Sequence, residues 1–425
     1  MSVKKNVLAN YLGTGIVAFA PLLALPWYLS ALGPAQFGLI GFMTLFQAVL
    51  GLLDAGMGQA LVREMALRFD VTRKVQRKAA ALLFGFERIY WLFALSVGCL
   101  VWFFAGWIAS SWLNLGALPS STGRIAVEGA AAIFAAQFPG SVYRSFLVGA
   151  QAQVRLNAVM VAGALLRHGG AVVVVVLWPS LATFAVWHAG AAFLETLTRR
   201  YLAWKMLGVE AGKVSWDAAE LRPVWRTVFA LSGAALLGAL TVQMDKIVLS
   251  RMVTLEQFGF YTVAASVALG VLQFMYPLTQ AVLPRAIQLR GEPAALRRLY
   301  IKLSGVIAAM VAAGAVMFIL AGHWLLTIWL KNDQAVAVIY PLLMVLLAGT
   351  VLNAFYNVGY IHWLVHDKVR RVLQVNVVSL ILAVTLVPLL VAWQGSMGAT
   401  FGWLVMNLIG LLLSLEWLKR KPHEK

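Results

Sequence analysis

The sequence is poor in cysteine and in charged side chains. Its 425 residues include one cysteine, Cys99, which excludes a disulfide framework within the chain and any multi-cysteine metal site. Only 12% of the residues are charged, whereas a soluble domain has about 25%. Cys99 lies within an apolar run, where a buried and unreactive thiol is expected. The composition therefore excludes a soluble globular enzyme.

The sequence also lacks the short motifs of enzyme chemistry. We find no glycine-rich nucleotide-binding motif, no His/Cys/carboxylate spacing typical of a metal site and no nucleophile–base signature. We therefore predict that the protein is not an enzyme, holds no metal and needs no cofactor.

Long apolar runs fill the sequence from end to end. Hydrophobic residues make up 62% of the chain, and the mean hydropathy is +0.84. A helix needs about 20 apolar residues to cross the hydrocarbon core, and this length predicts twelve spans with uncertain edges. The spans are 8–30, 37–60, 80–108, 125–148, 157–178, 182–204, 226–250, 258–283, 302–322, 335–360, 372–393 and 397–418. Pro21 and Pro26 and the lack of a cleavage site favour a retained first helix over a signal peptide.

The positions of the basic residues predict the orientation. With both termini in the cytoplasm, 27 of the 34 Lys and Arg residues fall on the cytoplasmic side, Arg199 among them. Three fall on the other side, namely Arg124, Arg251 and Lys331, and four lie within spans. The net charge of +18 thus reflects topology and contact with anionic lipid, and it does not indicate a nucleic-acid partner.

A short motif recurs between the two halves of the chain. Gln36-Phe37-Gly38 returns as Gln257-Phe258-Gly259, each time at the outer turn between the first and second spans of a set of six. We therefore predict an all-α polytopic membrane protein with two pseudo-symmetric six-helix bundles around a central cavity, as alternating access requires. The predicted parts are a bundle at 1–204, a cytoplasmic linker at 205–225, a bundle at 226–418 and a basic cytoplasmic tail at 419–425.

The longest connections on the predicted cytoplasmic side are basic. The connections 205–225 and 284–301 are interpreted as solvated loops, with amphipathic surface helices as the alternative. Tryptophans near span ends are interpreted as interfacial belts. They are Trp27, Trp107, Trp112, Trp178, Trp324, Trp329 and Trp393 at outer ends and Trp204, Trp225 and Trp417 at inner ends.

Several local patterns together resemble those of the polysaccharide flippases. They are Asn10-Tyr11-Leu12 with Gly13 and Gly15, Leu53-Asp54-Ala55-Gly56-Met57-Gly58 followed by Arg63-Glu64-Met65-Ala66, and Asp245-Lys246-Ile247 before Glu256-Gln257-Phe258-Gly259. The resemblance is to the O-antigen (Wzx-type) flippases, in the superfamily that also contains the MATE drug exporters and the lipid II flippases. Twelve spans match the polysaccharide branch, whereas lipid II flippases usually have fourteen.

The resemblance implies a function and a location. It implies a flippase that moves polyprenyl-diphosphate-linked oligosaccharide to the outer leaflet of the bacterial cytoplasmic (inner) membrane, for polysaccharide assembly. Membrane lipids and polysaccharide-assembly proteins are the other implied partners. A cation-coupled, MATE-like multidrug exporter is the main alternative. A membrane-embedded glycan polymerase or transferase is a weaker one, because such enzymes carry a larger outward loop.

Basic residues inside spans are the candidates for substrate binding. A charge inside a span is unfavourable by about 2.5–3.5 kcal/mol, and a guanidinium can hold a phosphate bidentately. Arg167 lies near the middle of span five beside Gly169-Gly170, which leaves room for a head group. Arg144, Arg88 and Lys246 are the further candidates. Arg144, Arg88 and Lys246 can instead snorkel to the interface.

The acids and one histidine are candidates for proton or sodium coupling. They are Glu195, Asp54, Asp245 and His168. Asp54, next to Gly56, has the alternative of ending a helix.

Two of the basic candidates, Arg167 and Arg88, can instead form structural ion pairs. Arg167 can form a structural pair with Glu195, at similar depth, and Arg88 can be neutralised by Glu87. Asp245 and Lys246 need not pair, because successive helical residues point about 100° apart. His188 is interpreted as a satisfied structural histidine.

Overall fold

The computed structural model describes residues 3–54, 56–68, 73–209, 211–215, 217–273 and 276–418. Over these ranges the chain is helical and contains no β-strand. It divides into two compact units, Met1–Leu240 and Thr241–Lys425. The linker predicted at 205–225 stays a prediction, and the predicted tail 419–425 lies outside the described residues.

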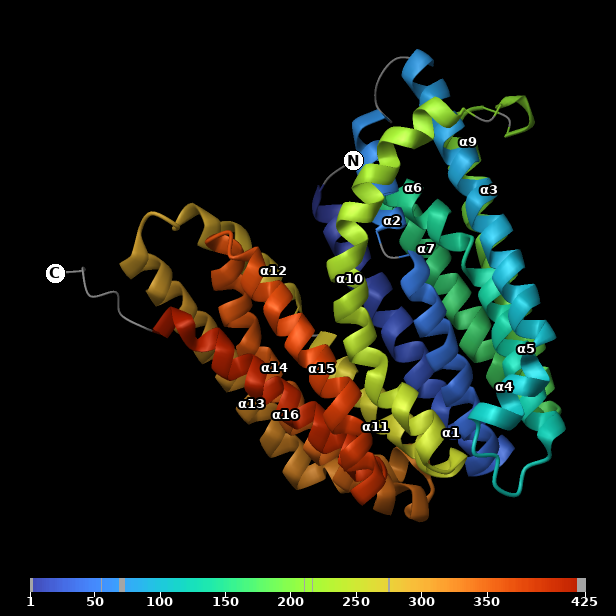
Figure 1. Cartoon of the computed structure of the whole chain (residues 1–425), viewed down its shortest axis with the longest axis vertical. Helices are drawn as coiled ribbons and strands as arrows, with labels where there is room; N and C mark the ends of the chain where they lie inside the picture. Colours follow the sequence, from blue (N-terminus) through green and yellow to red (C-terminus); the bar gives the residue numbers. More distant parts are fainter. Residues whose placement is uncertain are drawn as a thin grey trace. The chain divides into compact units, whose positions relative to one another are not determined.

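Unit 1 is a bundle of helices, several of which are interrupted (Figure 1). Its elements are α1 (Val3–Gly51), the 3₁₀ turn η1 (Leu52–Asp54), α2 (Met57–Arg68), α3 (Arg73–Phe103), α4 (Ala105–Trp112), α5 (Ser120–Gln137), α6 (Gly140–Gly149), α7 (Gln153–Ala164), the π-helical turn η2 (Leu165–Gly169), α8 (Gly170–Leu177), α9 (Leu181–Leu207), the 3₁₀ turn η3 (Ala211–Lys213) and the first part of α10 (Ala218–Met252).

Unit 2 is also built from helices. They are the last part of α10, α11 (Leu255–Gln273), α12 (Tyr276–Gln288), α13 (Pro293–Leu330), α14 (Asp333–Val365), α15 (Val369–Gln394), α16 (Ser396–Ser414) and the 3₁₀ turn η4 (Leu415–Leu418). Small residues let α14 lie against α16, since a Cβ atom at Gly359 would stand 2.2 Å from the Ser414 carbonyl oxygen.

The helices agree with a multi-pass membrane protein. Among the described residues, nine helical stretches are long and apolar enough to cross a bilayer. One of them, in α1, contains two predicted spans, and non-helical backbone at Gly33 (φ 77°, ψ 165°) divides it at their junction. Glycine reaches such a positive φ without steric penalty. Ten of the twelve predicted spans overlap these stretches, and the other two, 182–204 and 226–250, lie on the helices α9 (Leu181–Leu207) and α10 (Ala218–Met252). Over the described residues this confirms the all-α polytopic fold.

Both basic connections include the ends of helices. Helix α9 continues to Leu207 and ends at the left-handed Gly208 (φ 63°), and α10 begins at Ala218. The segment 284–301, interpreted as a solvated loop, is helical except for the turn between Gln288 and Pro293. The loop interpretation was wrong because most of this segment forms the end of α12 and the start of α13, which carry most of its charged residues.

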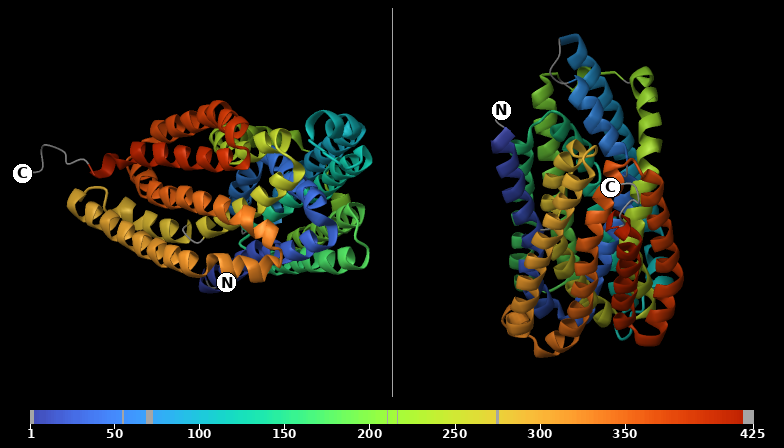
Figure 2. Two further views of the ribbon diagram at one scale, coloured as in Figure 1. Left: turned by 90° about the horizontal axis from the view of Figure 1, so that it is seen from below. Right: turned by 90° about the vertical axis from the view of Figure 1, so that its left-hand side faces the viewer.

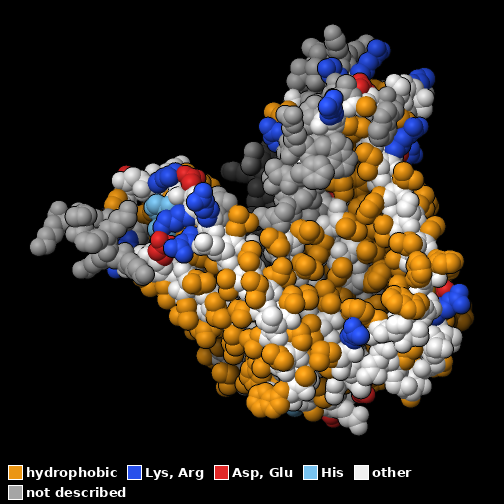
Figure 3. Space-filling model, viewed as in Figure 1, with side chains coloured by type: hydrophobic (Ala, Val, Ile, Leu, Met, Phe, Trp, Pro, Cys, Tyr) orange, Lys and Arg blue, Asp and Glu red, His pale blue; other side chains and the backbone are white. Residues whose placement is uncertain are grey.

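Charge and apolar surface are separated within each unit. In unit 1, Lys and Arg gather where α3 begins and α9 ends, around exposed Arg63, Arg77 and Lys205 (Figure 3). We call this the basic end of unit 1. Elsewhere the long helices, which run side by side in each unit (Figure 2), expose apolar residues such as Leu320 and Trp324. Exposed apolar faces of this kind match a hydrocarbon surrounding.

Cys99 corrects one expectation about that surface. It is exposed on α3, although its apolar run suggested burial. In a membrane protein, an apolar run can face the hydrocarbon as readily as the core, so hydropathy alone does not place the thiol.

Candidate functional site

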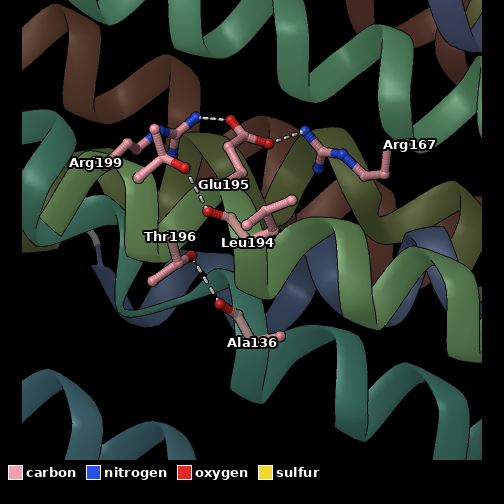
Figure 4. A network of polar contacts seen from close by, with 7 residues as sticks. Ala136, Arg167, Leu194, Glu195, Thr196 and Arg199 are labelled. Atoms are coloured by element: carbon pink, nitrogen blue, oxygen red, sulfur yellow. Dashed lines mark hydrogen bonds and ion pairs between the residues drawn. The ribbon is translucent and has the colours of Figure 1, made fainter. Parts of the chain in front are cut away.

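Two arginines share one buried carboxylate in unit 1. An oxygen of Glu195 on α9 accepts a hydrogen bond of 2.7 Å from Arg167 of η2. The other oxygen accepts from Arg199, one turn further along α9. Glu195 is only 6% exposed, and Figure 4 shows it between the two guanidinium groups. The predicted Arg167–Glu195 pair is confirmed. Arg199, which the sequence analysis assigned to the cytoplasmic side, binds the same carboxylate. We call Arg167, Glu195 and Arg199 the triad.

Local backbone features make room for this triad. A Cβ atom at Gly163 of α7 would stand 2.5 Å from the Glu195 Cδ atom, so glycine is required for this approach. Arg167 lies on the π-helical turn, a geometry that recurs at functional sites. Thr196 donates to the Ala136 carbonyl at 2.8 Å and so fixes α9 against the end of α5 (Figure 4).

The space beside Gly170 is already occupied. A Cβ atom there would stand 2.3 Å from the Trp187 ring, and the Trp187 indole N–H donates to the Leu166 carbonyl at 2.9 Å. Room for a head group was expected beside Gly169-Gly170; the tryptophan fills the space at Gly170, whereas a Cβ atom at Gly169 would meet nothing within 4 Å.

The triad lines a cavity of about 240 Å³ that lies wholly within unit 1. Its walls come from α1, α5, α6, α7, η2 and α9. The lining residues are Val17, Gln137, Ser141, Arg144, Met160, Ala164, Arg167, His168, Glu195 and Arg199. Among these described residues three arginines face one glutamate, so the cavity carries excess positive charge.

The three arginines lie at successive depths from the basic end. At 1.5 Å per helical residue, Arg144 lies about 8 Å from the end of α6, and Arg199 about 12 Å from the end of α9. Arg167 lies about 21 Å from the start of α7, close to the middle of its span. The cavity therefore offers guanidinium groups from near one end of the bundle to its centre.

Arg144 is the exposed member of this series. Within the described part of the chain it forms no ion pair closer than 4.0 Å. Asp54 is electrostatically coupled to it but does not line the cavity. The Asp54 carboxylate accepts hydrogen bonds from Tyr90 and from the Gly58 backbone N–H. It closes η1 just before Gly56 (φ 89°), as the helix-ending alternative predicted.

Arg88 lies apart from the cavity, and Glu87 does not neutralise it. Arg88 is exposed and stacks over the Phe84 ring at 4.3 Å. Glu87 instead accepts from the Arg200 Nε atom at 2.6 Å and from the Trp204 indole at 2.7 Å. Trp204 is thus a buried hydrogen-bond donor and not a residue of the interfacial belt, because its partner carboxylate lies inside the bundle.

Glu87 connects two helices that carry cavity arginines. Besides Arg200 on α9, it binds the Tyr143 hydroxyl on α6. Tyr143 directly precedes Arg144, and Arg200 directly follows Arg199. One carboxylate on α3 therefore holds the immediate neighbours of both arginines, and sequence reasoning missed this because the partners are far apart in the chain.

Two histidines lie beside the triad. The rings of His168 and His188 are 5.3 Å apart, and His188 stacks on Phe184 at 4.1 Å. Tyr28 donates to the His168 carbonyl at 3.2 Å. In the described structure His168 Nδ1 and His188 Nε2 are buried without a hydrogen-bond partner. The expectation that His188 is satisfied is therefore wrong, because its surroundings are aromatic.

Asp245 and Lys246 belong to unit 2. The Lys246 ammonium lies 3.4 Å from the Asp245 carboxylate, so the two neighbours do interact. Asp245 also accepts a hydrogen bond from Tyr261. The void beside them is only about 10 Å³, which is at the lower limit for one water molecule. No group of His, Cys, Asp and Glu within the described ranges could hold a metal ion.

Comparison with sequence models of known families identifies the family of this chain. Residues 3–290 match the sequence model of the family described as polysaccharide biosynthesis protein. The chain belongs to this family. A search of curated proteins finds no significant match to this member of the polysaccharide biosynthesis family.

Solved structures with the same fold are transporters. A lipid II flippase, MurJ, in an inward closed conformation matches with a TM-score of 0.71 at 11% identity, over 98% of this chain and 88% of its own. An inward-facing MATE multidrug resistance transporter matches with a TM-score of 0.69 at 15% identity, over 94% and 93%. A transporter of the same MOP superfamily from Pyrococcus furiosus matches with 0.55 at 14%, over 96% and 93%. At 11–15% identity, this structural likeness shows a shared fold alone.

Proposed function

We propose that this protein flips a polyprenyl-diphosphate-linked oligosaccharide from the cytoplasmic to the outer leaflet of the bacterial cytoplasmic membrane. The observation that carries the proposal is the excess of guanidinium groups in the unit 1 cavity, where Arg144, Arg167 and Arg199 face one carboxylate. Membership of the polysaccharide biosynthesis family supports a glycan as the transported group.

The chemistry of the head group matches the cavity. A diphosphate joins the lipid to the glycan, and its charge must pass the low-dielectric centre of the membrane. Arginine suits this task because its planar fork can hold phosphate oxygens bidentately and stays charged when buried. In the proposed path Arg144 receives the diphosphate near the basic end, and Arg199 and Arg167 hold it near the centre. The basic end faces the cytoplasm, together with both termini.

Glu195 gives the site a means of release. Its carboxylate competes with the diphosphate for the same two guanidinium groups, so protonation or displacement of Glu195 switches the site between binding and release. We propose Glu195 for coupling to protons or sodium, with Asp54 and His168 as further candidates in unit 1 and Asp245 in unit 2. Lys246 guides the diphosphate outward in this scheme, and alternating access runs between the bundles 1–204 and 226–418.

A cation-coupled multidrug exporter is the second candidate, favoured by the fold shared with MATE transporters. A cavity that takes up cationic drugs needs excess acid. The unit 1 cavity contains one acid against three arginines among its described lining residues. This charge balance favours the diphosphate substrate.

Deletion of the gene separates the two candidates. For the flippase we expect accumulation of lipid-linked oligosaccharide in the cytoplasmic leaflet and loss of surface polysaccharide. Wild-type protein should restore export, and Arg167→Ala at equal membrane abundance should not. Unchanged surface polysaccharide together with new sensitivity to cationic drugs would transfer the assignment to the exporter.

A further inference from the structure

An open apolar groove runs along unit 1 between α8 and α9. Its volume is about 570 Å³. Its lining residues are Leu166, Val174, Ala182, Thr183, Val186, Trp187, Gly190, Ala191 and Leu194. No charged side chain is found among these described residues, and Thr183 contributes the one hydroxyl group. The groove is therefore shaped for hydrocarbon.

The groove and the arginine cavity are lined by consecutive residues of the same two helical segments. Leu166 lines the groove and the next residue, Arg167, lines the cavity. Leu194 and Glu195 repeat this division on α9. Successive Cα atoms are about 3.8 Å apart, so the groove and the cavity lie on two faces of the same pair of helical segments, separated by their side chains.

Small residues and one fixed indole shape the groove. A Cβ atom at Gly190 would find no heavy atom within 4 Å, so the groove floor is open there. The Trp187 side chain is held by its hydrogen bond to the Leu166 carbonyl and by its packing on Gly170. The shape is thus built into the helices and does not depend on a mobile loop.

We propose that this groove binds the polyprenyl chain of the lipid-linked substrate while the diphosphate lies between Arg167 and Arg199. The inference rests on the proposed function and names a second subsite for the same substrate. Lipid tails are as apolar as the groove, so the chain gains packing contacts and orientation and little from leaving the bilayer. The groove should therefore select for a long prenyl chain with a moderate effect on affinity.

A second groove in unit 1 supplies the control. It lies between α3 and α5, has a volume of about 360 Å³ and is lined by residues such as Leu95, Phe103 and Ala132. None of its described lining residues precedes or follows a residue of the arginine cavity. A lipid-filled groove without a role in transport should behave like this one.

The test fills each groove with an aromatic side chain. Gly190→Phe projects into the open α8–α9 groove, and Ala132→Phe fills the α3–α5 groove. Gly314→Phe is the matched glycine control, since it is exposed on α13 and a Cβ atom there meets nothing within 4 Å. Each variant is reconstituted in vesicles with a prenyl-diphosphate oligosaccharide that bears either a 55-carbon or a 10-carbon chain.

We expect Gly190→Phe to raise the KM for the long-chain substrate about fivefold and to leave the short-chain KM unchanged, an effect of the size that packing contacts give. Both control variants should match wild type on both substrates. If Gly190→Phe does not insert, Gly190→Leu replaces it. Equal effects on both chain lengths, or none, would overturn the groove assignment.

A second readout locates the chain directly. A 55-carbon prenyl diphosphate with a terminal diazirine should label α8 and α9 in wild type, and Gly190→Phe should reduce this labelling while Ala132→Phe does not. Labelling confined to α3 and α5 would refute the proposal. Wild-type protein that flips neither substrate would refute the proposed function itself, whereas flipping of both without dependence on residue 190 would refute only the groove.

Discussion

Arg199 and Arg200 are neighbours on α9, but their guanidinium groups bind different carboxylates. Arg199 binds Glu195 in the cavity, and Arg200 binds Glu87 of α3. Successive residues of a helix point about 100° apart, so one turn of α9 can serve two environments. The Glu87 contact fixes the rotation of the helix, and that rotation directs Arg199 into the cavity.

Replacement of Arg167 tests the central role of the triad. Arg167→Ala should reduce flipping at least about tenfold, the equivalent of about 1.4 kcal/mol, because the diphosphate loses its deepest guanidinium. Arg167→Lys should retain part of the activity, since lysine supplies the charge without the bidentate fork. Flipping is measured in reconstituted vesicles at equal protein content.

The double variant Arg167→Ala/Glu195→Ala separates binding from structure. If the pair only neutralises itself, removal of both charges should restore transport, because no orphaned charge remains. We expect no recovery. Full flipping by the double variant would remove Arg167 from the substrate site.

Glu195→Gln should bind the diphosphate more tightly and release it more slowly. The substitution removes the internal carboxylate that competes for Arg167 and Arg199. We expect about tenfold higher affinity for a fluorescent prenyl diphosphate, or about 1.4 kcal/mol, and a lower turnover rate. Weaker binding would mean that Glu195 chiefly holds the two arginines in place.

Glu87→Gln should disturb the cavity from outside it. The change removes the charge that binds Arg200 and Trp204, and a lost buried charge-assisted hydrogen bond destabilises by about 1.5–3 kcal/mol. We expect a lower Tm and a higher KM for the diphosphate substrate. Glu128→Gln is the control, because its partner Arg124 is exposed and such pairs contribute about 0–1 kcal/mol. A lower Tm with an unchanged KM would limit Glu87 to stability.

Gly163→Ala should damage the site through one methyl group. The new Cβ atom would stand 2.5 Å from the Glu195 Cδ atom, so the carboxylate must move away from its arginines. Overpacking of this kind is unfavourable by about 1–3 kcal/mol, and we expect loss of flipping with a lower Tm. Gly169→Ala is the matched control, since a Cβ atom there meets nothing within 4 Å. Equal activity of the two variants would contradict the importance of this approach.

The spans and the central ion pair were predictable because both depend on position along the chain. Arg167 and Glu195 each lie near the middle of an apolar run, and neighbouring spans at equal depth can meet. The number of residues per span fixes that depth whatever the details of packing.

The partners of Arg199 and Arg200 were not predictable in the same way. Counting basic residues along the sequence shows how far each one lies from the end of a span. It does not show which face of the helix the side chain is on. The spacing of four residues from Glu195 to Arg199 was the available signal, since such residues share a helix face. The Glu87–Arg200 contact joins positions 113 residues apart, and only tertiary packing reveals it.

The π-helical turn at Leu165–Gly169 sets the phase between the two parts of its span. A π turn holds one residue more than an α turn, so the faces of α7 and α8 do not continue one another in a simple 3.6-residue rhythm. Deletion of a single residue within this turn would rotate all of α8 by about 100°. Val174 would leave the groove and Gly170 would leave Trp187. The number of residues in this turn therefore determines which side chains of α8 line the groove.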